Sequence, residues 1–190
     1  MSNVVLVTGG FDPIHKGHIE YFKEAKLLGD KLIVGLNSDH WLTRKKGKPF
    51  MDLENRAMVI QSLNMVDEVI IFNDEDNTSC HAIHQALQFY DEVIFANGGD
   101  RLISNIPEYE KYSNDERVKF VCNVGGDKTE SSSWLLDEWK SPKTLRKWGY
   151  YKDLYLGKGF KVKELVIKPF SCLSMQRHEY RSELWNLVSG

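Results

Sequence analysis

Short apolar runs alternate with amphipathic helical patterns over the first 140 residues, and this alternation constrains the fold more than any other feature. Five runs are rich in valine, isoleucine and leucine, as expected of buried strands, and they span 4–7, 31–36, 68–72, 92–96 and 117–121. Between them, apolar residues recur at helical spacing over 18–28, 53–63 and 80–89. This order predicts an α/β fold with a doubly wound parallel sheet.

The pattern changes after residue 140. Pro142 and three glycines punctuate a basic, aromatic stretch that predicts a linker. Apolar residues then recur over 161–168 and 184–188, which predicts at least two further strands. We therefore expect three parts: a main domain over 1–140, a linker over 141–160 and a β tail over 161–190.

Charge and cysteine content argue against several classes of protein. The 25 Lys and Arg residues nearly balance the 27 Asp and Glu residues, so we expect no nucleic-acid or membrane partner. Cys80, Cys122 and Cys172 are odd in number and form no CxxC pair, which argues against a disulfide framework and a structural zinc site. The N-terminal apolar run is too short for a signal peptide or a membrane span. We expect a cytoplasmic protein.

The segment GGFDPIHKGH follows the first predicted strand, where open α/β sheets bind ligands. Gly9 and Gly10 allow backbone amides to approach an anion, and a helix beginning near Gly17 directs its unpaired N–H groups to the same place. His15 and His18 share a helix face, so both imidazoles can reach one set of phosphate oxygens. The segment predicts a phosphate site, although an isolated HxxH is also typical of two unrelated surface histidines or of a metal pair.

This segment resembles the GxFDxxHxGH signature of the cytidylyltransferase-like nucleotidyltransferases, which have a Rossmann-like fold. In that family the two histidines stabilise the pentacoordinate α-phosphate and the departing pyrophosphate, and the resemblance implies this catalytic role for His15 and His18. It implies that nucleotide binding involves Gly9, Gly10, Phe11, Asp12 and Gly17. Asp12 has two interpretations: it positions the acceptor or a Mg²⁺ ion, which we favour, or it caps the turn.

A longer resemblance covers LIVGLNSDHWLTRKKGKPFMDLENRAMVIQSLNMVDEVIIF. This stretch is similar to the corresponding part of bacterial heptose 1-phosphate adenylyltransferases, and glycerol-3-phosphate cytidylyltransferases are the nearest other relatives. The match implies that Lys46 is a catalytic, phosphate-binding lysine on a flexible loop, with Lys45 and Lys48 as neighbours able to take the role. Without the motif, residues 44–48 would be interpreted as a solvated basic loop.

Two more stretches resemble motifs of the same family. Gly99 and Asp100 follow the fourth predicted strand and resemble its GGD element, which implies that Asp100 binds ribose or orders the nucleotide. The stretch DKTESSS resembles a second signature, R-T-x-x-I-S-[ST]-T, with Lys128 at the arginine position and Ser132 and Ser133 at the hydroxyls. Lysine supplies the charge but not the bidentate geometry of arginine. The structural alternatives are a turn aspartate and a helix N-cap with spare serines.

Residues from about 146 to 190 are similar to the start of the cupin domain of type II mannose-6-phosphate isomerases and mannose-1-phosphate guanylyltransferases. Those cupins read H-H-H-R-x-E-H-W where this chain has His178, Tyr180, Glu183 and Trp185 at the matching stretch. Because one expected histidine is tyrosine and the second cupin motif is absent, we expect no metal site in this partial cupin. Two partial barrels could cover their open strand edges by pairing, which predicts a homodimer.

Together these features predict an enzyme that transfers a nucleoside monophosphate from ATP or CTP to a sugar phosphate or polyol phosphate and releases pyrophosphate, with Mg²⁺ on the NTP. The acceptor phosphate oxygen is already nucleophilic, so no general base is required. One alternative is a glycerol-3-phosphate-type cytidylyltransferase. Another is a non-catalytic nucleotide or sugar-phosphate binding module, which the lysine at 128 suggests and the two histidines argue against.

Overall fold

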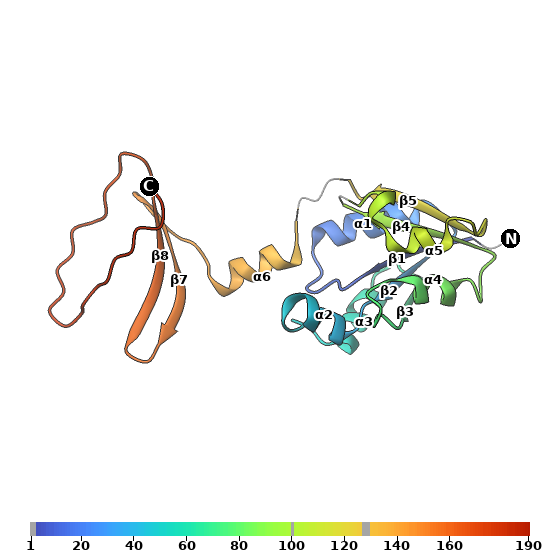
Figure 1. Cartoon of the computed structure of the whole chain (residues 1–190), viewed down its shortest axis with the longest axis horizontal. Helices are drawn as coiled ribbons and strands as arrows, with labels where there is room; N and C mark the ends of the chain where they lie inside the picture. The colour runs from blue at the N-terminus through green and yellow to red at the C-terminus, as the bar shows by residue number, and fades with distance from the viewer. Residues whose placement is uncertain (1–2, 100, 127–129) are drawn as a thin grey trace. The chain divides into compact units, whose positions relative to one another are not determined.

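The computed structural model describes residues 3–99, 101–126 and 130–190 and contains two compact units, Met1–Leu136 and Asp137–Gly190. Unit 1 contains one parallel sheet with strand order β3-β2-β1-β4-β5 (Figure 1). Its strands are β1 (Asn3–Gly9), β2 (Lys31–Leu36), β3 (Glu68–Ile71), β4 (Glu92–Gly98) and β5 (Val118–Val124). The predicted doubly wound, Rossmann-like sheet is confirmed.

Helices cover both faces of this sheet. Val4 and Leu6 of β1 pack in a core with α4 and α5, whereas Val5 and Val7 point to the opposite face and pack in a core with α1 and α3. The helices are α1 (Lys16–Lys26), α2 (Asp39–Lys46), α3 (Leu53–Gln61), α4 (Cys80–Ala86), the 3₁₀ helix η1 (Ile103–Asn105), α5 (Pro107–Tyr112) and α6 (Ser132–Lys140). Burial on both faces explains why the central strands are continuous apolar runs.

The strand order reverses beside β1. The chain passes from β1 to β2 and β3 on one side, and then returns to β4, which is the neighbour of β1 on the other side. The carboxyl ends of β1 and β4 therefore flank the crevice where doubly wound sheets bind ligands. Gly9 ends β1 and Gly98 ends β4, so two glycine-containing turns meet at this edge.

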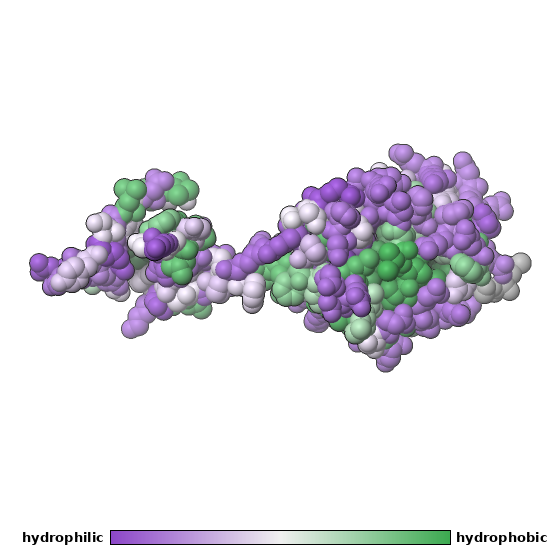
Figure 2. Space-filling model, turned by 90° about the horizontal axis from the view of Figure 1, so that it is seen from below, coloured by the Kyte–Doolittle hydropathy of each residue, from purple (hydrophilic) through white to green (hydrophobic). Residues whose placement is uncertain are grey.

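One edge of the sheet is less buried than its interior. In β3 no residue is fully buried, whereas five of the six residues of β2 are. Met58 and Val59 of α3 and Ile71 of β3 remain exposed. Figure 2 shows a hydrophobic patch within the otherwise hydrophilic surface of unit 1.

Unit 2 contains an antiparallel sheet of β6 (Thr144–Arg146), β7 (Gly149–Gly157) and β8 (Phe160–Ile167), in that order. The segment 141–160 was expected to be a linker, but it forms β6 and β7. Its glycines mark turns rather than an extended connection, because Gly157 pairs with Phe160 across a two-residue loop in which Gly159 has a φ of +85°.

The strand predicted over 184–188 is not formed. The described residues that follow Ile167 contain no regular secondary structure. An apolar run becomes a strand only beside a partner whose backbone groups pair with it, and no such partner is present among the described residues of this unit. The alternation of side chains alone was therefore insufficient evidence for this strand.

Candidate active site

The turn between β1 and α1 places His15 and His18 against each other. His15 is the N-cap of α1 and His18 is its third residue, and their rings stack with centroids 3.7 Å apart. The His15 backbone N–H donates to Nδ1 of His18 at 3.3 Å, so the proton of a neutral His18 ring lies on Nε2. The Phe11 ring packs edge-on against His18, with centroids 5.0 Å apart. The structure thus brings together the two histidines predicted to bind one phosphate group.

The environment of His18 favours its neutral imidazole. Burial lowers the pKa of His18 from its ordinary value of 6.5 to about 3, and the charges of His15 and Lys46 act in the same direction. Nδ1 of His15 lies 3.6 Å from a carboxylate oxygen of Glu130. A polyanion close to His18 would favour its protonated form, so ligand binding and proton uptake are linked at this ring.

Lys46 lies at the last position of α2 and not in the flexible loop that was expected. Lysines in the last turn of a helix are favoured by its dipole, and the following glycine ends the helix with a φ of +87°. The Lys46 ammonium donates to the backbone carbonyl of Asp12 at 3.0 Å. Burial lowers the pKa of Lys46, and the negative charge of Asp12 acts in the opposite direction. Lys45 instead lies over the Trp41 ring at 4.4 Å, and Lys48 is exposed.

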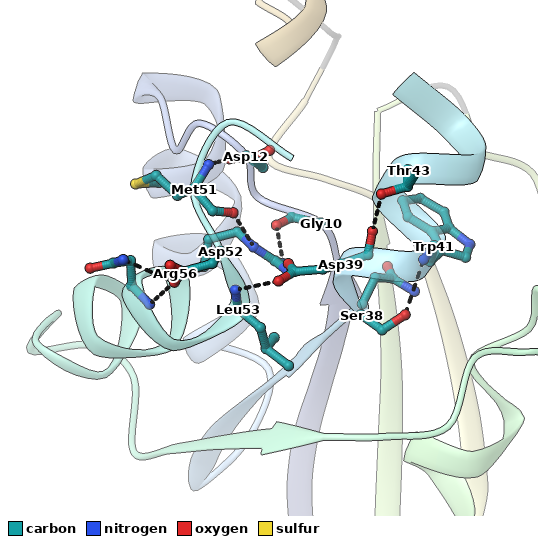
Figure 3. A network of polar contacts seen from close by, with 12 residues as sticks. Gly10, Asp12, Ser38, Asp39, Trp41, Thr43, Met51, Asp52, Leu53 and Arg56 are labelled. Atoms are coloured by element: carbon teal, nitrogen blue, oxygen red, sulfur yellow. Dashed lines mark hydrogen bonds and ion pairs between the residues drawn. The ribbon is translucent and has the colours of Figure 1, made fainter. Parts of the chain in front are cut away.

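Asp12 is a buried anchor for the loop after α2. Its side chain has no solvent exposure, and its two carboxylate oxygens accept the backbone N–H groups of Phe50 at 2.6 Å and Met51 at 2.8 Å (Figure 3). Each oxygen is therefore engaged by the chain itself. This geometry favours the structural alternative for Asp12, and the role in positioning the acceptor or Mg²⁺ stays a prediction.

A buried arginine that the sequence did not single out joins the same loop to the end of β1. Arg56 has no exposed surface, and its guanidinium donates to the carbonyls of Gly10 at 2.9 Å and Met51 at 3.2 Å. It also donates to the Asp39 carboxylate at 2.7 Å, which in turn accepts the N–H of Leu53 (Figure 3). Arg56 thereby fixes the positions of the glycine turn, α2 and α3 relative to one another.

The predicted glycines of the turn are required by close packing. A Cβ atom at Gly9 would lie 2.9 Å from the Phe11 ring, and one at Gly10 would lie 2.7 Å from Leu42. At Gly17 it would lie 3.2 Å from the His15 ring. Phe11 itself is 6% exposed. Side chains at these glycine positions would therefore displace the groups that support the histidines.

The end of β4 contributes a second set of backbone and amide groups. Gly99 follows this strand with a φ of +69°, and Asp100 lies outside the described residues. Asn97 is 5% exposed, and its side-chain nitrogen has no hydrogen-bond partner among the described residues. A buried amide of this kind at the crevice is a candidate ligand donor to which the sequence analysis gave no role.

The stretch that resembles the second family signature, DKTESSS, contacts the turn between β1 and α1 through Ser132. Ser132 begins α6, is buried, and donates its hydroxyl to the carbonyl of Pro13 at 2.9 Å. Ser133 is exposed, and its N–H donates to the Ser131 hydroxyl at 3.3 Å. Lys128 lies outside the described residues. The structure therefore brings Ser132 to the histidine turn, where its hydroxyl bonds to the backbone.

A cavity of about 380 Å³ lies at the carboxyl ends of β1 and β2. Thr8 and Gly9 form part of its wall, so it adjoins the histidine turn. Most of the remaining wall carries hydroxyl and amide groups, and Arg101 and Glu108 are its charged residues within the described ranges. Its volume is in the range of small-molecule sites. The sequence analysis did not identify Glu108.

Comparison with known proteins identifies the family. The model of the cytidylyltransferase-like family matches residues 6–164. The chain belongs to the cytidylyltransferase-like family. The predicted family resemblance is thus confirmed, although the comparisons do not address the cupin-like tail.

Individual relatives of this cytidylyltransferase-like chain match different shares of its length. The bifunctional protein HldE of Helicobacter pylori (strain P12) is 46% identical over 141 residues, which is 73% of this chain and 28% of HldE. HldE of Wolinella succinogenes is 37% identical over 99 residues, 51% of this chain and 20% of that protein. The chain therefore spans less than a third of the length of these curated relatives.

A solved structure matches over almost all of its own length. The lipopolysaccharide core biosynthesis protein from Thermoplasma volcanium GSS1 is 32% identical, with a TM-score of 0.51. The match covers 65% of this chain and 97% of that protein. This chain thus shares its fold with that protein over about two thirds of its length.

Two further features of this cytidylyltransferase-like protein concern metals and membranes. Over residues 3–99, 101–126 and 130–190, no three His, Cys, Asp or Glu side chains form a cluster able to hold a metal ion. In unit 2, Nε2 of His178 lies 3.7 Å from a Glu183 oxygen, and Arg181 contacts both residues. None of the helices within the described ranges has the length and hydropathy of a membrane span.

Proposed function

We propose that this chain transfers a nucleoside monophosphate from ATP or CTP to a sugar phosphate or polyol phosphate, with release of pyrophosphate. The observation that supports this function most strongly is the stacked pair of His15 and His18 at the start of α1, with the Lys46 ammonium of α2 bonded to the same turn. The pair lies where a doubly wound sheet binds phosphates. Membership of the cytidylyltransferase-like family supports the same chemistry.

In the proposed reaction, an oxygen of the acceptor phosphate forms a bond to the α-phosphorus of the NTP. The bond between the α-phosphorus and the bridging oxygen to the β-phosphate breaks, and pyrophosphate leaves with the electron pair. Negative charge increases on the α-phosphate oxygens and on the leaving group in the transition state. The Nε2–H of His18, the His15 ring and the N-terminal amides of α1 are suited to stabilise this charge.

Lys46 would stabilise the leaving pyrophosphate. In the free protein its ammonium donates to the Asp12 carbonyl, and on nucleotide binding it would exchange this neutral acceptor for a phosphate oxygen. A charge-assisted bond to phosphate is stronger than one to a carbonyl. The acceptor phosphate is anionic before it attacks, so no side chain has to remove a proton from it.

Mg²⁺ enters the proposal with the NTP. Among the described residues, no three metal-binding side chains form a cluster, and both Asp12 oxygens accept backbone N–H groups, so the residues present do not by themselves form a complete magnesium cage. Magnesium is commonly held by substrate phosphates and water in such enzymes, where it offsets phosphate charge. The residue roles above are derived without it.

The proposal is tested by measuring pyrophosphate release with ATP, CTP, GTP and UTP against sugar 1-phosphates and glycerol 3-phosphate. One NTP and acceptor pair should give release, and His18→Ala should reduce the rate by about 100-fold to 1000-fold, the usual loss for a donor to a transition-state anion. His84→Ala is the matched control, because His84 is an exposed histidine on α4. Nucleotide binding by the wild type without release from any pair would favour the non-catalytic binding module.

We also propose that the chain is a cytoplasmic homodimer paired through unit 2. The β6 and β8 strands are the edges of its sheet, and Leu156 and Val162 on β7 and β8 are exposed. Exposed strand edges pair readily with a second copy. The free cysteines suit a reducing compartment. A monomeric mass in light scattering would contradict the dimer.

A further inference from the structure

The cavity beside the histidine turn contains a buried carboxylate with an unused oxygen. Glu108 in α5 is 2% exposed. Its Oε1 accepts the backbone N–H of Ser79, whereas its Oε2 has no hydrogen-bond partner among the described residues. Buried polar groups in folded proteins are almost always hydrogen-bonded, because an unpaired one retains its full desolvation cost. The unpaired Oε2 oxygen therefore indicates that a bound ligand supplies the hydrogen-bond donor.

The rest of the cavity wall suits a molecule with several hydroxyl groups. Such molecules are bound by side chains that both donate and accept hydrogen bonds. The wall carries groups of this kind from Thr8, Asn37, Thr78, Ser79 and Asn105. The cavity has the chemistry of a carbohydrate or polyol site.

The charges around the cavity favour a hydroxyl over an ammonium as the missing donor. Arg101 lines the same cavity as Glu108, so a cationic ligand would meet a charge of its own sign. The Trp41 ring, which also lines the cavity, already carries the Lys45 ammonium at 4.4 Å from its centroid. A hydroxyl can donate to Glu108 without either conflict.

We propose that Glu108 is a specificity residue that accepts a hydrogen bond from a hydroxyl of the acceptor, and that it selects sugar or polyol phosphates over phosphates that lack this hydroxyl. The inference rests on the proposed nucleotidyl transfer. One cavity is lined by both Gly9 and Glu108. In the proposed binding mode, the acceptor phosphate lies at the histidine turn, which continues from Gly9, and the hydroxylated carbons extend into the cavity towards Glu108.

Glu108→Gln is the test variant, because glutamine can keep the oxygen that accepts from Ser79 and place a donor where Oε2 was an acceptor. The dissociation constant and KM of the acceptor should rise about 10-fold or more, as for other hydrogen bonds to a charged group. The KM of the NTP should stay within about twofold, because the change lies on the acceptor side. Glu110→Gln, an exposed position on the same helix, is the matched control and should leave both constants unchanged.

Monodeoxy analogues of the acceptor provide a second measurement that requires no variant to fold. One analogue should bind the wild type about 10-fold or more weakly than the parent sugar phosphate. The same analogue should lose no further affinity in Glu108→Gln, because the two changes remove one interaction. The inference is overturned if the affinity losses from the deoxy analogue and from Glu108→Gln add up. It is also overturned if the wild type binds every analogue as tightly as the parent sugar phosphate.

Direct binding keeps this inference separate from the proposed function. Glucose 1-phosphate, mannose 1-phosphate, glycerol 3-phosphate and phosphoethanolamine are titrated calorimetrically into the protein without NTP. Binding of a hydroxylated phosphate that is weakened in Glu108→Gln supports the inference even if no pyrophosphate is ever released. No binding of any hydroxylated phosphate, unchanged binding in the variant, or a preference for phosphoethanolamine overturns it, whereas pyrophosphate release by the wild type would still support nucleotidyl transfer.

Discussion

Asp12→Asn tests whether the buried carboxylate holds the loop after α2 or serves the ligand. In the wild type its two oxygens accept the N–H groups of Phe50 and Met51. Asparagine keeps one acceptor oxygen and turns an NH₂ group towards the other N–H donor. The variant therefore loses one charge-assisted hydrogen bond, weakens the second, and leaves a buried backbone donor unpaired.

The expected loss follows from these contacts. A hydrogen bond to a charged group contributes about 1.5–3 kcal/mol, and an unsatisfied buried donor costs about 1–3 kcal/mol. Because these contributions overlap, the free energy of unfolding should fall by about 2–5 kcal/mol. In a domain of this size that corresponds to a Tm lower by about 5–15 °C.

Thermal unfolding followed by circular dichroism measures this loss. Asp52→Asn is the matched control, because Asp52 is an exposed N-cap that accepts from Asn55, and asparagine caps helices about as well as aspartate. The control should change the unfolding free energy by less than about 0.5 kcal/mol. An unchanged Tm in Asp12→Asn, together with a higher Mg²⁺ requirement for pyrophosphate release, would refute the structural role.

Three further predictions concern stability. Arg56→Met removes the guanidinium that contacts Gly10, Met51 and Asp39, and it should lower the unfolding free energy by about 3–5 kcal/mol in urea titrations; a loss below about 1 kcal/mol would contradict its structural role. The pKa of His18 in the folded protein, about 3, lies below its ordinary value of 6.5, so the unfolded state binds the additional proton between these values. The stability contribution of neutral His18 is thus complete above pH 6.5 and is lost towards pH 3, by at most about 1.4 kcal/mol per pH unit. His18→Gln should flatten this pH dependence of the urea midpoint. If the urea midpoints of the variant and the wild type change in parallel with pH, the depressed pKa of His18 is contradicted. Gly125→Ala places a Cβ atom 2.8 Å from a backbone atom of helix α1 at a φ of +84°, and should cost about 1–3 kcal/mol; a melting temperature equal to that of the wild type would show that this turn relaxes freely.

The fold was predictable where one periodicity dominates. The continuous apolar run over 31–36 became β2 with the predicted bounds, because its side chains are buried on both faces of the sheet. The helix over Asp39–Lys46 was missed because only Leu42 in it is buried, so it has no apolar stripe. The sequence signals for this helix lie at its two ends, where Ser38 is the N-cap and a basic last turn precedes Gly47.

In the candidate site, too, local patterns were predictable and long-range contacts were not. His15 and His18 were predictable because a local spacing fixes which residues share a helix face. The contacts of Asp12, Arg56 and Glu108 were not predictable, because their partners lie far away in sequence. The separations are 38 residues for Asp12 and Phe50, 46 for Arg56 and Gly10, and 29 for Glu108 and Ser79. Sequence spacing contains no information about such contacts until the sheet order is known.

Burial of the His18 imidazole, which lowers its pKa, makes the site sensitive to the charge of its ligand. The Lys46 ammonium attracts any phosphate, whereas His18 adds a positive charge only when the ligand's negative potential draws a proton onto its ring. A triphosphate supplies more negative potential than a monophosphate. The preference for NTP over NMP should therefore grow as the pH falls from 7 to 5, and calorimetry in two buffers of different ionisation enthalpy would measure the proton taken up. Selectivity of this kind depends on charge density and not on shape.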